Sequence, residues 1–460
     1  MTSAAAVAEL PAGSPYRDYV YAYPHKTAYR PLRPPPPLRE VWAGERRDAL
    51  FLYLHVPFCE MRCGFCNLFT QSLPAAELPG AYLDALGRQA AVVRDALGDG
   101  AMYARAAVGG GTPTFLDPGQ LDLLFDIAEG MLGARLGTIP MSVETSPATA
   151  SADRLRVLRE RGVTRVSIGV QSFLEAENRQ VGRPQGRAEV ERALTAIRAA
   201  GVPVLNIDLM YGIQGQTGAT WRASLAAALA HRPEELYLYP LYVRPLTGLG
   251  RRQGRSRSTK NPVRVPWTAW DDQRMRRYRE GREHLLAAGY EQVSMRMFRL
   301  PGPGSRVTGP AYCCQDDGMV GLGSGARSYT TALHYSYDYA VGSTSVKSIV
   351  ADFLERSTHG FTTAEIGFWL DGEEQRRRWL LKSLLRTEGV DLPAYGRRFG
   401  TGLAGDFPEL ERLGELGWVE GMGSDGRLRL TAEGLAFSDM IGPWLFSEGV
   451  REAMDAWELR

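Results

Sequence analysis

The feature that most constrains the fold is a repeated alternation of short apolar runs and amphipathic stretches between residue 51 and about residue 245. The runs are rich in Val, Ile, Leu and Tyr, as strands are. The stretches between them repeat apolar residues at helical spacing. Such βα units form a parallel sheet with right-handed crossovers. The runs are FLYLHVP (51–57), ARAAVGGG (104–111), IPMSVETS (139–146), RVSIGVQS (165–172), VLNIDLMYG (204–212) and ELYLYPLYV (235–243).

Six such units predict an α/β fold, an incomplete (β/α)6 barrel, because they are too few for the full eight-fold barrel. Gly162 and Gly201 each follow a helical stretch, where glycine commonly ends a helix. In a barrel of this kind the chemistry sits at the C-terminal ends of the strands. Residues at the ends of the six runs are therefore the first candidates for a functional site.

Three cysteines lie directly after the first predicted strand, in YLHVPFCEMRCGFC. Cys59, Cys63 and Cys66 have the spacing C-x3-C-x2-C, and three thiolates on one loop can ligate three irons of a [4Fe–4S] cluster. The fourth iron then has no protein ligand, which predicts a cluster that binds S-adenosylmethionine (SAM) and cleaves it reductively. The spacing alone also allows a zinc site, with His55 nearby, or plain buried thiols.

The end of the second run, VGGGTPT (108–114), carries three consecutive glycines. Glycine lets the backbone approach a ligand closely, so Gly109, Gly110 and Gly111 can offer N–H and C=O groups to the amino and carboxylate groups of SAM. Thr112 adds a hydroxyl. The alternative is a tight turn before a helix capped by Asp117.

Charged and amide side chains end three further runs. Glu144 can accept hydrogen bonds from a ribose or an ammonium group, and Gln171 ends the next run. Arg183, twelve residues on, suits the methionyl carboxylate, because arginine binds carboxylates bidentately. Asp208 is costly to bury alone, so we expect it to contact a ligand or Arg183. Taken singly, Glu144 and Arg183 also fit solvated surface positions.

The segments outside the six units are less regular. The tyrosine-rich stretch 16–42 contains Pro34–Pro37, which predicts an extended polyproline II segment, either a linker or an arm across the main domain. Residues 413–437 predict a helix followed by a hairpin, as in a winged helix. We expect an N-terminal arm (1–48), the barrel (49–300), a Gly-rich extension and connector (301–358) and a mostly helical, winged-helix-like C-terminal lid domain (359–460).

Composition and charge indicate the class of protein and the compartment in which we expect it. The chain is 44% hydrophobic and 23% charged, which is typical of globular proteins. No run of about 20 apolar residues predicts a membrane span, and no secretory signal is evident. A thiolate-held cluster needs a reducing compartment, so we expect a cytoplasmic protein. The net charge of +2 argues neither for nor against nucleic acid, and we expect no nucleic acid partner because no candidate recognition helix is conspicuously basic.

Two smaller features of the sequence each allow more than one interpretation. The basic stretch 251–264 could bind an anionic substrate or a partner protein, or could be a solvated insertion. Cys313 and Cys314 could form a redox-active pair, but small apolar filling of the interior is the simpler interpretation.

Seven motifs occur in order between about residues 50 and 330: YLHVPFCxxxCxFC, GGGTPT, VETSP, SIGVQSF, VGRPQ, NIDLMYG and GYEQ…GLGSGARS. Together they resemble the oxygen-independent coproporphyrinogen III oxidase family of radical SAM enzymes, including its haem-chaperone branch. The resemblance implies a radical SAM (β/α)6 barrel covered by a C-terminal helical domain, with Cys59, Cys63 and Cys66 as cluster ligands. The positions that match SAM contacts in the family are Tyr53, Phe65, Gly110, Gly111, Thr112, Glu144, Gln171, Arg183 and Asp208.

The resemblance also implies cofactors and partners. These are a [4Fe–4S] cluster, one or two molecules of SAM, a small-molecule substrate and a flavodoxin-like or ferredoxin-like electron donor. Cleavage of SAM would give a 5′-deoxyadenosyl radical that abstracts hydrogen from the substrate, while the protein supplies binding, orientation and exclusion of water.

The chain departs from the named branches at several positions. Leu68 stands where the porphyrinogen-decarboxylating branch has a fourth cysteine, and Arg296 intrudes in VSMRMFR. AYCCQDDGMVGLG lacks the HNxxYW-like stretch of the haem chaperones, and Arg327 in GLGSGARS replaces an aliphatic residue. The chain therefore resembles a third group better, which includes two-SAM methylases and cyclopropanases. Four functions stay open: oxidation of a small molecule, one-carbon transfer, haem delivery, and dehydrogenation of coproporphyrinogen III itself.

Overall fold

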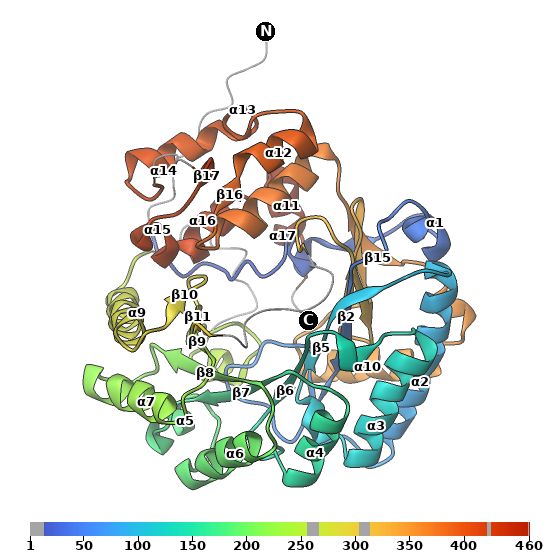
Figure 1. Ribbon diagram of the computed structural model, residues 1–460, viewed down its shortest axis with the longest axis horizontal. Helices are drawn as coiled ribbons and strands as arrows, with labels where there is room; N and C mark the ends of the chain where they lie inside the picture. The colour runs from blue at the N-terminus through green and yellow to red at the C-terminus, as the bar shows by residue number, and fades with distance from the viewer. Residues whose placement is uncertain (1–12, 255–265, 303–312, 421–424, 459) are drawn as a thin grey trace.

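The computed structural model describes residues 13–254, 266–302, 313–420, 425–458 and 460. Six parallel strands form the centre of its large sheet, and each of the six predicted runs is one of them. The predicted incomplete barrel is thus confirmed (Figure 1). The strands are β2 (Leu50–Val56), β5 (Tyr103–Gly110), β6 (Met141–Thr145), β7 (Arg165–Gln171), β8 (Val204–Tyr211) and β9 (Glu235–Pro240).

Helices connect these strands and cover the outer face of the sheet (Figure 1). The predicted glycine stops are present, because Gly162 and Gly201 have φ of 78° and 71° just after two of the helices. That left-handed conformation carries no steric cost for glycine. These helices are α2 (Leu78–Leu97), α3 (Pro118–Asp126), α4 (Ala152–Glu160), α5 (Glu175–Gln180), α6 (Arg187–Ala199) and α7 (Gly218–Ala230), and after β9 the chain continues through the short helix α8 (Gly248–Arg252) into α9 (Ala269–Ala287).

The sheet does not close, because further strands extend it at both edges. At one edge β12 (Met319–Leu322) runs parallel to β2, and β13 (Arg327–Tyr329), β14 (Leu333–Ser336), β15 (Ile366–Trp369) and β1 (Arg30–Pro31) follow in antiparallel order. At the other edge β11 (Met297–Arg299) and β10 (Glu291–Gln292) follow β9. The sheet therefore runs across the domain boundaries drawn from the sequence, which stay a prediction.

Alternation along the strands separates an apolar outer face from a polar inner face. In β9, Leu236 and Leu238 are fully buried, and Leu238 lies against the helices α7 and α9. Tyr237 and Tyr239 point the other way and stack with their ring centroids 5.8 Å apart. Because strand side chains alternate, the helix-covered face builds the core and the other face lines the barrel interior. An interior lined with polar groups suits a ligand better than tight packing does.

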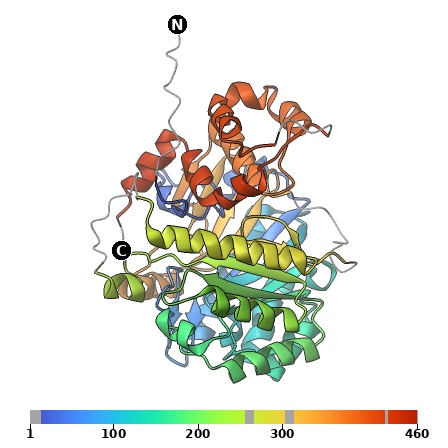
Figure 2. The same ribbon diagram turned by 90° about the vertical axis from the view of Figure 1, so that its left-hand side faces the viewer.

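A mostly helical C-terminal domain sits over the barrel opening, as predicted (Figures 1 and 2). Within it β16 (Val390–Asp391) pairs with β17 (Arg427–Leu428), and Val419 bridges Leu430. The hairpin expected after a helix is thus present in the described residues. The helices are α11 (Gly372–Leu384), α12 (Leu392–Phe399), α13 (Leu403–Asp406), α14 (Glu411–Glu415), α15 (Ala432–Ala436), α16 (Ser438–Trp444) and α17 (Glu448–Asp455).

The N-terminal segment is an arm rather than a linker. From residue 13 it runs between the C-terminal domain and the barrel (Figure 1, blue). The Asp18 amide donates to the carbonyl of Asp439 at 3.2 Å, and Asp18 pairs with Arg244 at 2.7 Å. The arm then pairs with β15 through β1 and continues through Pro34–Pro37 into α1 (Leu38–Ala43), which precedes β2. Among the described residues, no helix has the length and apolarity needed to cross a bilayer.

A buried ion pair joins the barrel to the C-terminal domain. Arg296 precedes β11, and its guanidinium binds the carboxylate of Asp439 on α16, which also accepts from the Tyr242 hydroxyl. The side chains of Arg296 and Asp439 are 4% and 1% exposed. The arginine that departs from the family pattern therefore has a structural partner.

We expect Arg296→Met to lower the free energy of unfolding by about 3–5 kcal/mol, because it leaves Asp439 buried without its countercharge. The double variant Arg296→Met/Asp439→Leu should recover most of that loss. Urea unfolding measures both, with the exposed Arg412→Met, which breaks a surface pair with Glu415, as a control within about 1 kcal/mol of wild type. A single variant as stable as the control would show that the pair does not hold the two domains together.

Candidate active site

The cysteine loop follows β2 and is held at its centre by backbone contacts. The Gly64 amide donates to the carbonyl of Gly182 at 3.2 Å, and the Leu249 amide donates to the carbonyl of Gly64 at 2.7 Å. A Cβ atom on Gly64 would lie 2.7 Å from the carbonyl oxygen of Val181. Position 64 therefore requires glycine, and the loop is clamped between the end of α5 and the start of α8.

Each of the three thiols has its own polar neighbour. Thr112 donates its hydroxyl to Cys59 Sγ at 3.5 Å, and Arg183 donates to Cys63 Sγ at 3.1 Å. Cys66 Sγ lies 3.7 Å from the hydroxyl of Thr70. The loop thus brings two sequence-predicted site residues, Thr112 and Arg183, into contact with two of the predicted cluster ligands.

Burial raises the pKa of Cys59 to about 12 and raises that of Cys63 above its usual value, although Arg183 opposes the rise at Cys63. Such thiols ionise when a cation offsets the cost, and a coordinating thiol is deprotonated outright. Three half-buried, disulfide-free cysteines on one loop therefore fit thiolate ligation of a metal.

The arrangement suits a cluster better than a single zinc ion. In the part of the chain that the structure describes, no three His, Cys, Asp or Glu side chains are grouped around a point that would hold one ion. Both ring nitrogens of His55 already have partners, with Nε2 3.1 Å from the carbonyl of Phe69 and Nδ1 3.3 Å from the Tyr53 hydroxyl. In a [4Fe–4S] cube each thiolate binds a different iron, so the three sulfurs need not converge.

The glycine-rich end of β5 lies directly against the cysteine loop. The Thr112 amide donates to the carbonyl of Phe58 at 2.7 Å, and a Cβ on Gly111 would lie 2.5 Å from that oxygen. The Gly110 amide donates to Glu144 Oε2 at 3.2 Å. A Cβ on Gly109 would lie 2.9 Å from the same carboxyl group. The glycines therefore make room for the loop and for Glu144.

Two carboxylates on neighbouring parts of the inner face keep accessible surface, Glu144 more than Asp208. Burial, and then the charge of Asp208, raise the pKa of Glu144 to about 7, although its side chain keeps accessible surface. Burial raises the pKa of Asp208 to about 6, opposed by a hydrogen bond from Asn206 at 2.7 Å. Asp208 is thus bonded to Asn206 rather than paired directly with Arg183. A cationic ligand between the two carboxylates would favour ionisation of both.

Arg183 is held in place from β7. Its Nη2 donates to the carbonyl of Gly169 at 2.9 Å, and its Nε donates to Gln185 at 2.7 Å. Gln171, at the end of β7, has φ of 65° beside a register shift. A non-glycine residue in this left-handed conformation is strained, and such strain concentrates at functional sites.

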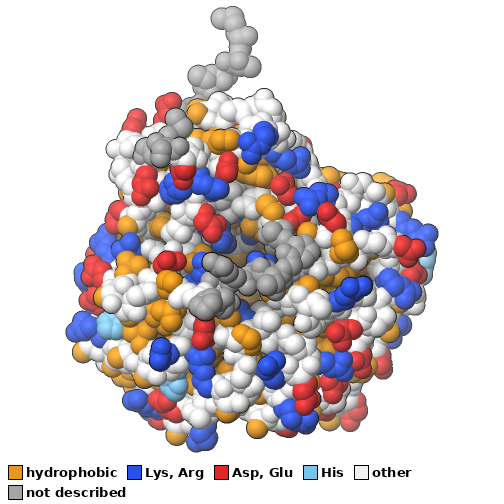
Figure 3. Space-filling view, in the orientation of Figure 1, with side chains coloured by type: hydrophobic (Ala, Val, Ile, Leu, Met, Phe, Trp, Pro, Cys, Tyr) orange, Lys and Arg blue, Asp and Glu red, His pale blue; other side chains and the backbone are white. Residues whose placement is uncertain are grey.

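Tyr53 and Phe65 complete the predicted SAM contacts. Tyr53 lines a cavity of about 70 Å³ beside the cysteine loop, together with His55, Phe69 and Gly110. Phe65 packs on a small apolar cluster that includes Val181. The space-filling view shows the surface hollowed near its centre, with basic side chains in the hollow (Figure 3).

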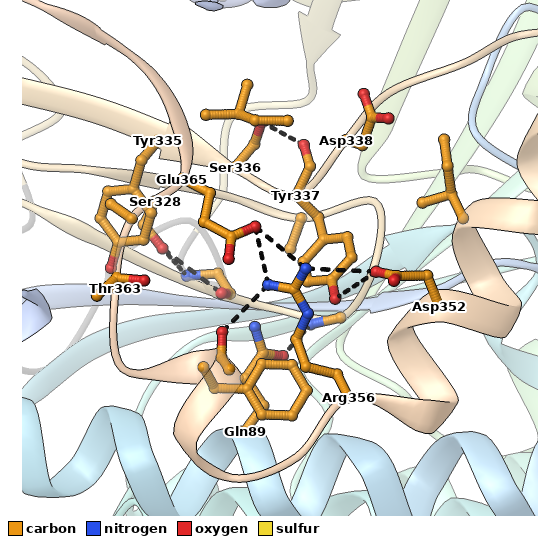
Figure 4. Close-up of a pocket in the computed structure, with 18 of the residues that line it drawn as sticks. Gln89, Ser328, Tyr335, Ser336, Tyr337, Asp338, Asp352, Arg356, Thr363 and Glu365 are labelled. Carbon is orange, nitrogen blue, oxygen red and sulfur yellow. Dashed lines mark hydrogen bonds and ion pairs between the residues drawn. The ribbon is translucent and has the colours of Figure 1, made fainter. Parts of the chain in front are cut away.

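A larger pocket of about 380 Å³ lies elsewhere, between the added strands and the helices α2 and α10 (Ser343–Glu355) (Figure 4). Arg356 crosses it, bound to Glu365 at 3.1 Å and to Asp352 at 3.4 Å. Its lining contains no cysteine and no residue from the strand ends of the barrel. The pocket is therefore not the candidate active site.

Comparisons with known proteins agree with this geometry. The profile of the radical SAM superfamily matches residues 53–228. An oxygen-independent coproporphyrinogen III oxidase of Cereibacter sphaeroides is 30% identical over 352 residues, 73% of each chain. This chain belongs to the radical SAM superfamily, in the coproporphyrinogen III oxidase-like family.

A second relative and a solved structure also match this chain. "Heme chaperone HemW" of Bacillus subtilis is 28% identical over 404 residues, which are 85% of this chain and 98% of that protein. The structure of coproporphyrinogen III oxidase from Escherichia coli matches with a TM-score of 0.74 at 21% identity, over 95% of this chain and 97% of that one, which shows a shared fold. Membership in the radical SAM superfamily implies a [4Fe–4S] cluster and SAM.

Several residues that contact the radical SAM site escaped the sequence motifs. Glu60, inside the cysteine loop, accepts from Ser146 at the end of β6 at 2.7 Å. Lys26 and Tyr21 of the N-terminal arm lie near the barrel opening, and Lys26 lines the cavity beside the loop. In the sequence, the high tyrosine content of the arm was the feature that could have pointed to a role for the arm in the site. Cys313 and Cys314 both contact Gln315 at 3.3 Å, and residues 255–264 of the basic stretch lie outside the described residues.

We expect Cys63→Ala to prevent assembly of the iron–sulfur cluster, because one of three thiolate ligands is lost. Anaerobic reconstitution followed by iron analysis and the brown iron–sulfur absorption measures the effect. Cys314→Ala is the matched control and should reconstitute as wild type does. A Cys63→Ala protein with the full iron content would remove this cysteine from the ligand set.

Glu144 and Asp208 predict a pH dependence of stability. Both pKa values are raised on folding, so the folded chain binds their protons more tightly than the unfolded chain does. Their contribution to stability is complete below about pH 4 and is lost as pH rises through about 6 and 7. Glu144→Gln should flatten this fall, by less than the roughly 1.4 kcal/mol per pH unit of a fully buried proton, because Glu144 keeps accessible surface.

Urea unfolding of cluster-free protein without SAM, at pH values between about 5 and 7, measures the slope. The exposed Glu160→Gln is the control and should keep the slope of the wild type. Equal slopes in wild type and Glu144→Gln would show that Glu144 titrates alike in the folded and unfolded chain.

Proposed function

We propose that this protein is a radical SAM enzyme that holds a [4Fe–4S] cluster on Cys59, Cys63 and Cys66 and abstracts hydrogen from a small-molecule substrate. The observation that carries the proposal is the contact of Thr112 and Arg183 with two of these thiols. Predicted cluster ligands and predicted SAM-binding residues, which are far apart in sequence, meet at one end of the barrel. When bound, the cluster supplies the single electron that cleaves SAM.

The surrounding residues have defined tasks in this proposal. Arg183 is oriented by Gly169 and Gln185, so its charge stays beside the cysteine loop, where it would bind the methionyl carboxylate. Glu144 and Asp208 would accept hydrogen bonds from the ammonium or ribose groups of SAM. The C-terminal domain and the arm cover the opening and would exclude water from a reactive intermediate.

The direct test is anaerobic incubation of reconstituted protein with SAM and dithionite, with products measured by mass spectrometry. We expect 5′-deoxyadenosine from wild type and none from Cys63→Ala. S-adenosylhomocysteine beside it would favour one-carbon transfer, and conversion of added coproporphyrinogen III would favour the porphyrinogen reaction. A protein with an intact cluster that forms no 5′-deoxyadenosine would contradict the proposed chemistry.

We expect Arg183→Ala to weaken SAM binding by roughly 10- to 150-fold, because a hydrogen bond to a charged group contributes about 1.5–3 kcal/mol. Isothermal titration of reconstituted protein with SAM measures the affinity, and iron analysis shows that the cluster is retained. Arg179→Ala is the matched control, since Arg179 lies close by on α5 and is 66% exposed. Unchanged affinity in the Arg183 variant would remove this residue from the SAM site.

A haem carrier is a second candidate function, favoured by one observation. The haem chaperone of Bacillus subtilis matches over 98% of its own length, so the likeness extends beyond the barrel. Stoichiometric uptake in a haem titration, together with no formation of 5′-deoxyadenosine, would favour the carrier over the enzyme.

A further inference from the structure

We propose that Lys26 and Arg327 form an anion subsite in the barrel cavity, which receives a carboxylate or phosphate group of the substrate. The inference rests on the proposed function for the identity of the cavity as the active site. Lys26 comes from the N-terminal arm and Arg327 begins β13. Both lie outside the stretch that matches the superfamily profile, residues 53–228.

Both cations line the cavity beside the cysteine loop. The same cavity is bounded by Tyr53 and Gly110, two of the predicted SAM contacts, and by Phe69 of the segment that follows the cysteines. Tyr339 also lines the cavity, and its hydroxyl donates to the carbonyl of Asn67, next to Cys66, at 2.9 Å. A ligand group bound by the two cations would therefore lie next to the predicted SAM site.

Neither cation has a carboxylate partner among the described residues. The ammonium of Lys26 lies 3.6 Å from the centroid of the Tyr339 ring. Arg327 donates to the hydroxyl of Tyr21 at 2.6 Å, and its guanidinium lies 4.7 Å from the centroid of that ring. These are contacts with aromatic rings and a neutral hydroxyl, so neither cation forms an ion pair within the part of the chain that the structure describes.

Two carboxylates in the surroundings of the pair already have partners. Asp18, whose charge acts on Lys26, is bound to Arg244 at 2.7 Å. Asp338, in the wall of the cavity, is bound to Arg460. The countercharge that these two groups could offer is therefore shared with other arginines.

Other arginines with little exposed side chain differ in this respect. Arg296 is paired with Asp439, and Arg274 with Asp271, and in both pairs each side chain is at most 5% exposed. Burying a cation without a countercharge is costly, and two cations facing one cavity repel each other. Burial, and then the charge of Arg327, hold the pKa of Lys26 well below its usual value. An anionic group in the cavity would relieve both costs.

The walls indicate the rest of the ligand. Tyr53, Phe69, Tyr337 and Tyr339 present aromatic surface around the two cations. Aromatic walls with a few placed charges are typical of sites for organic ligands. The subsite thus suits an organic acid or an organic phosphate with an apolar body. Arginine and lysine bind either group, so the chemistry shared by the two sources is the anion itself.

The test measures thermal unfolding of reconstituted protein with increasing benzoate, phenyl phosphate or neutral benzamide at constant ionic strength. A ligand of the folded state raises Tm with concentration, which gives its Kd. We expect the aromatic anions to raise Tm and benzamide not to do so. The larger effect of benzoate or of phenyl phosphate identifies a carboxylate or a phosphate as the preferred group.

Lys26→Gln and Arg327→Gln should each weaken anion binding by roughly 10- to 150-fold, and Arg327→Lys should retain more of it than Arg327→Gln. Lys347→Gln, an exposed lysine on α10, is the matched control and should bind the anions as wild type does. Anion binding that survives in both Gln variants, or benzamide binding equal to that of benzoate, would overturn the subsite.

A parallel titration with S-adenosylhomocysteine separates substrate recognition from cofactor recognition. Loss of S-adenosylhomocysteine affinity by the same factor as anion affinity would assign the two cations to the cofactor and overturn the proposal. None of these measurements needs SAM cleavage. Failure to form 5′-deoxyadenosine would therefore contradict the proposed function while leaving the anion subsite standing.

Discussion

The backbone contact between Gly64 and Gly182 is the constraint on which the site depends. A Cβ on Gly182 would lie 2.9 Å from the Cα of Gly64, and one on Gly64 would lie 2.7 Å from the carbonyl of Val181. Because both residues are glycines, the backbone of the cysteine loop can pack closely against the segment that carries Arg183. Because that segment is reached from β7, the positions of the thiols are tied to the strand ends of the barrel rather than to the loop alone.

The side chains on the inner face of the barrel suit an open sheet. A closed barrel fills its interior with layers of branched apolar side chains. Here Glu144, Asp208 and Tyr239 point inward, and the two carboxylates have raised pKa values because burial disfavours their charge. These groups would destabilise a dry core, whereas an open barrel covered by a separate domain can bring a ligand to them. The barrel interior is therefore less tightly packed than an apolar core, and a cationic cofactor bound there would contact the two carboxylates.

The sequence predicted what depends on local periodicity and spacing. All six strands and the helices between them follow from apolar alternation over a few residues, and the cysteine spacing identifies the loop without any knowledge of the fold. Contacts between segments that are distant in the chain produce no such local pattern in the sequence. Tyr21 and Arg327 are 306 residues apart, and Arg296 and Asp439 are 143 residues apart. The arm showed only an excess of tyrosine, which indicated neither its path nor the cavity that it lines.

Chemistry and recognition are consequently encoded in different parts of this chain. The thiols, the glycine-rich turn and the strand-end carboxylates lie within or near the barrel units. The arm and the segment from β12 onward also line the cavity beside the cysteine loop, where they supply Lys26, Arg327 and Tyr339. A substitution of Lys26 or Arg327 can change which molecule is held beside the cysteine loop and leave the clamp at Gly64 in place, because that clamp involves neither residue. A chain of this architecture can therefore keep the family's cysteine loop while its substrate diverges.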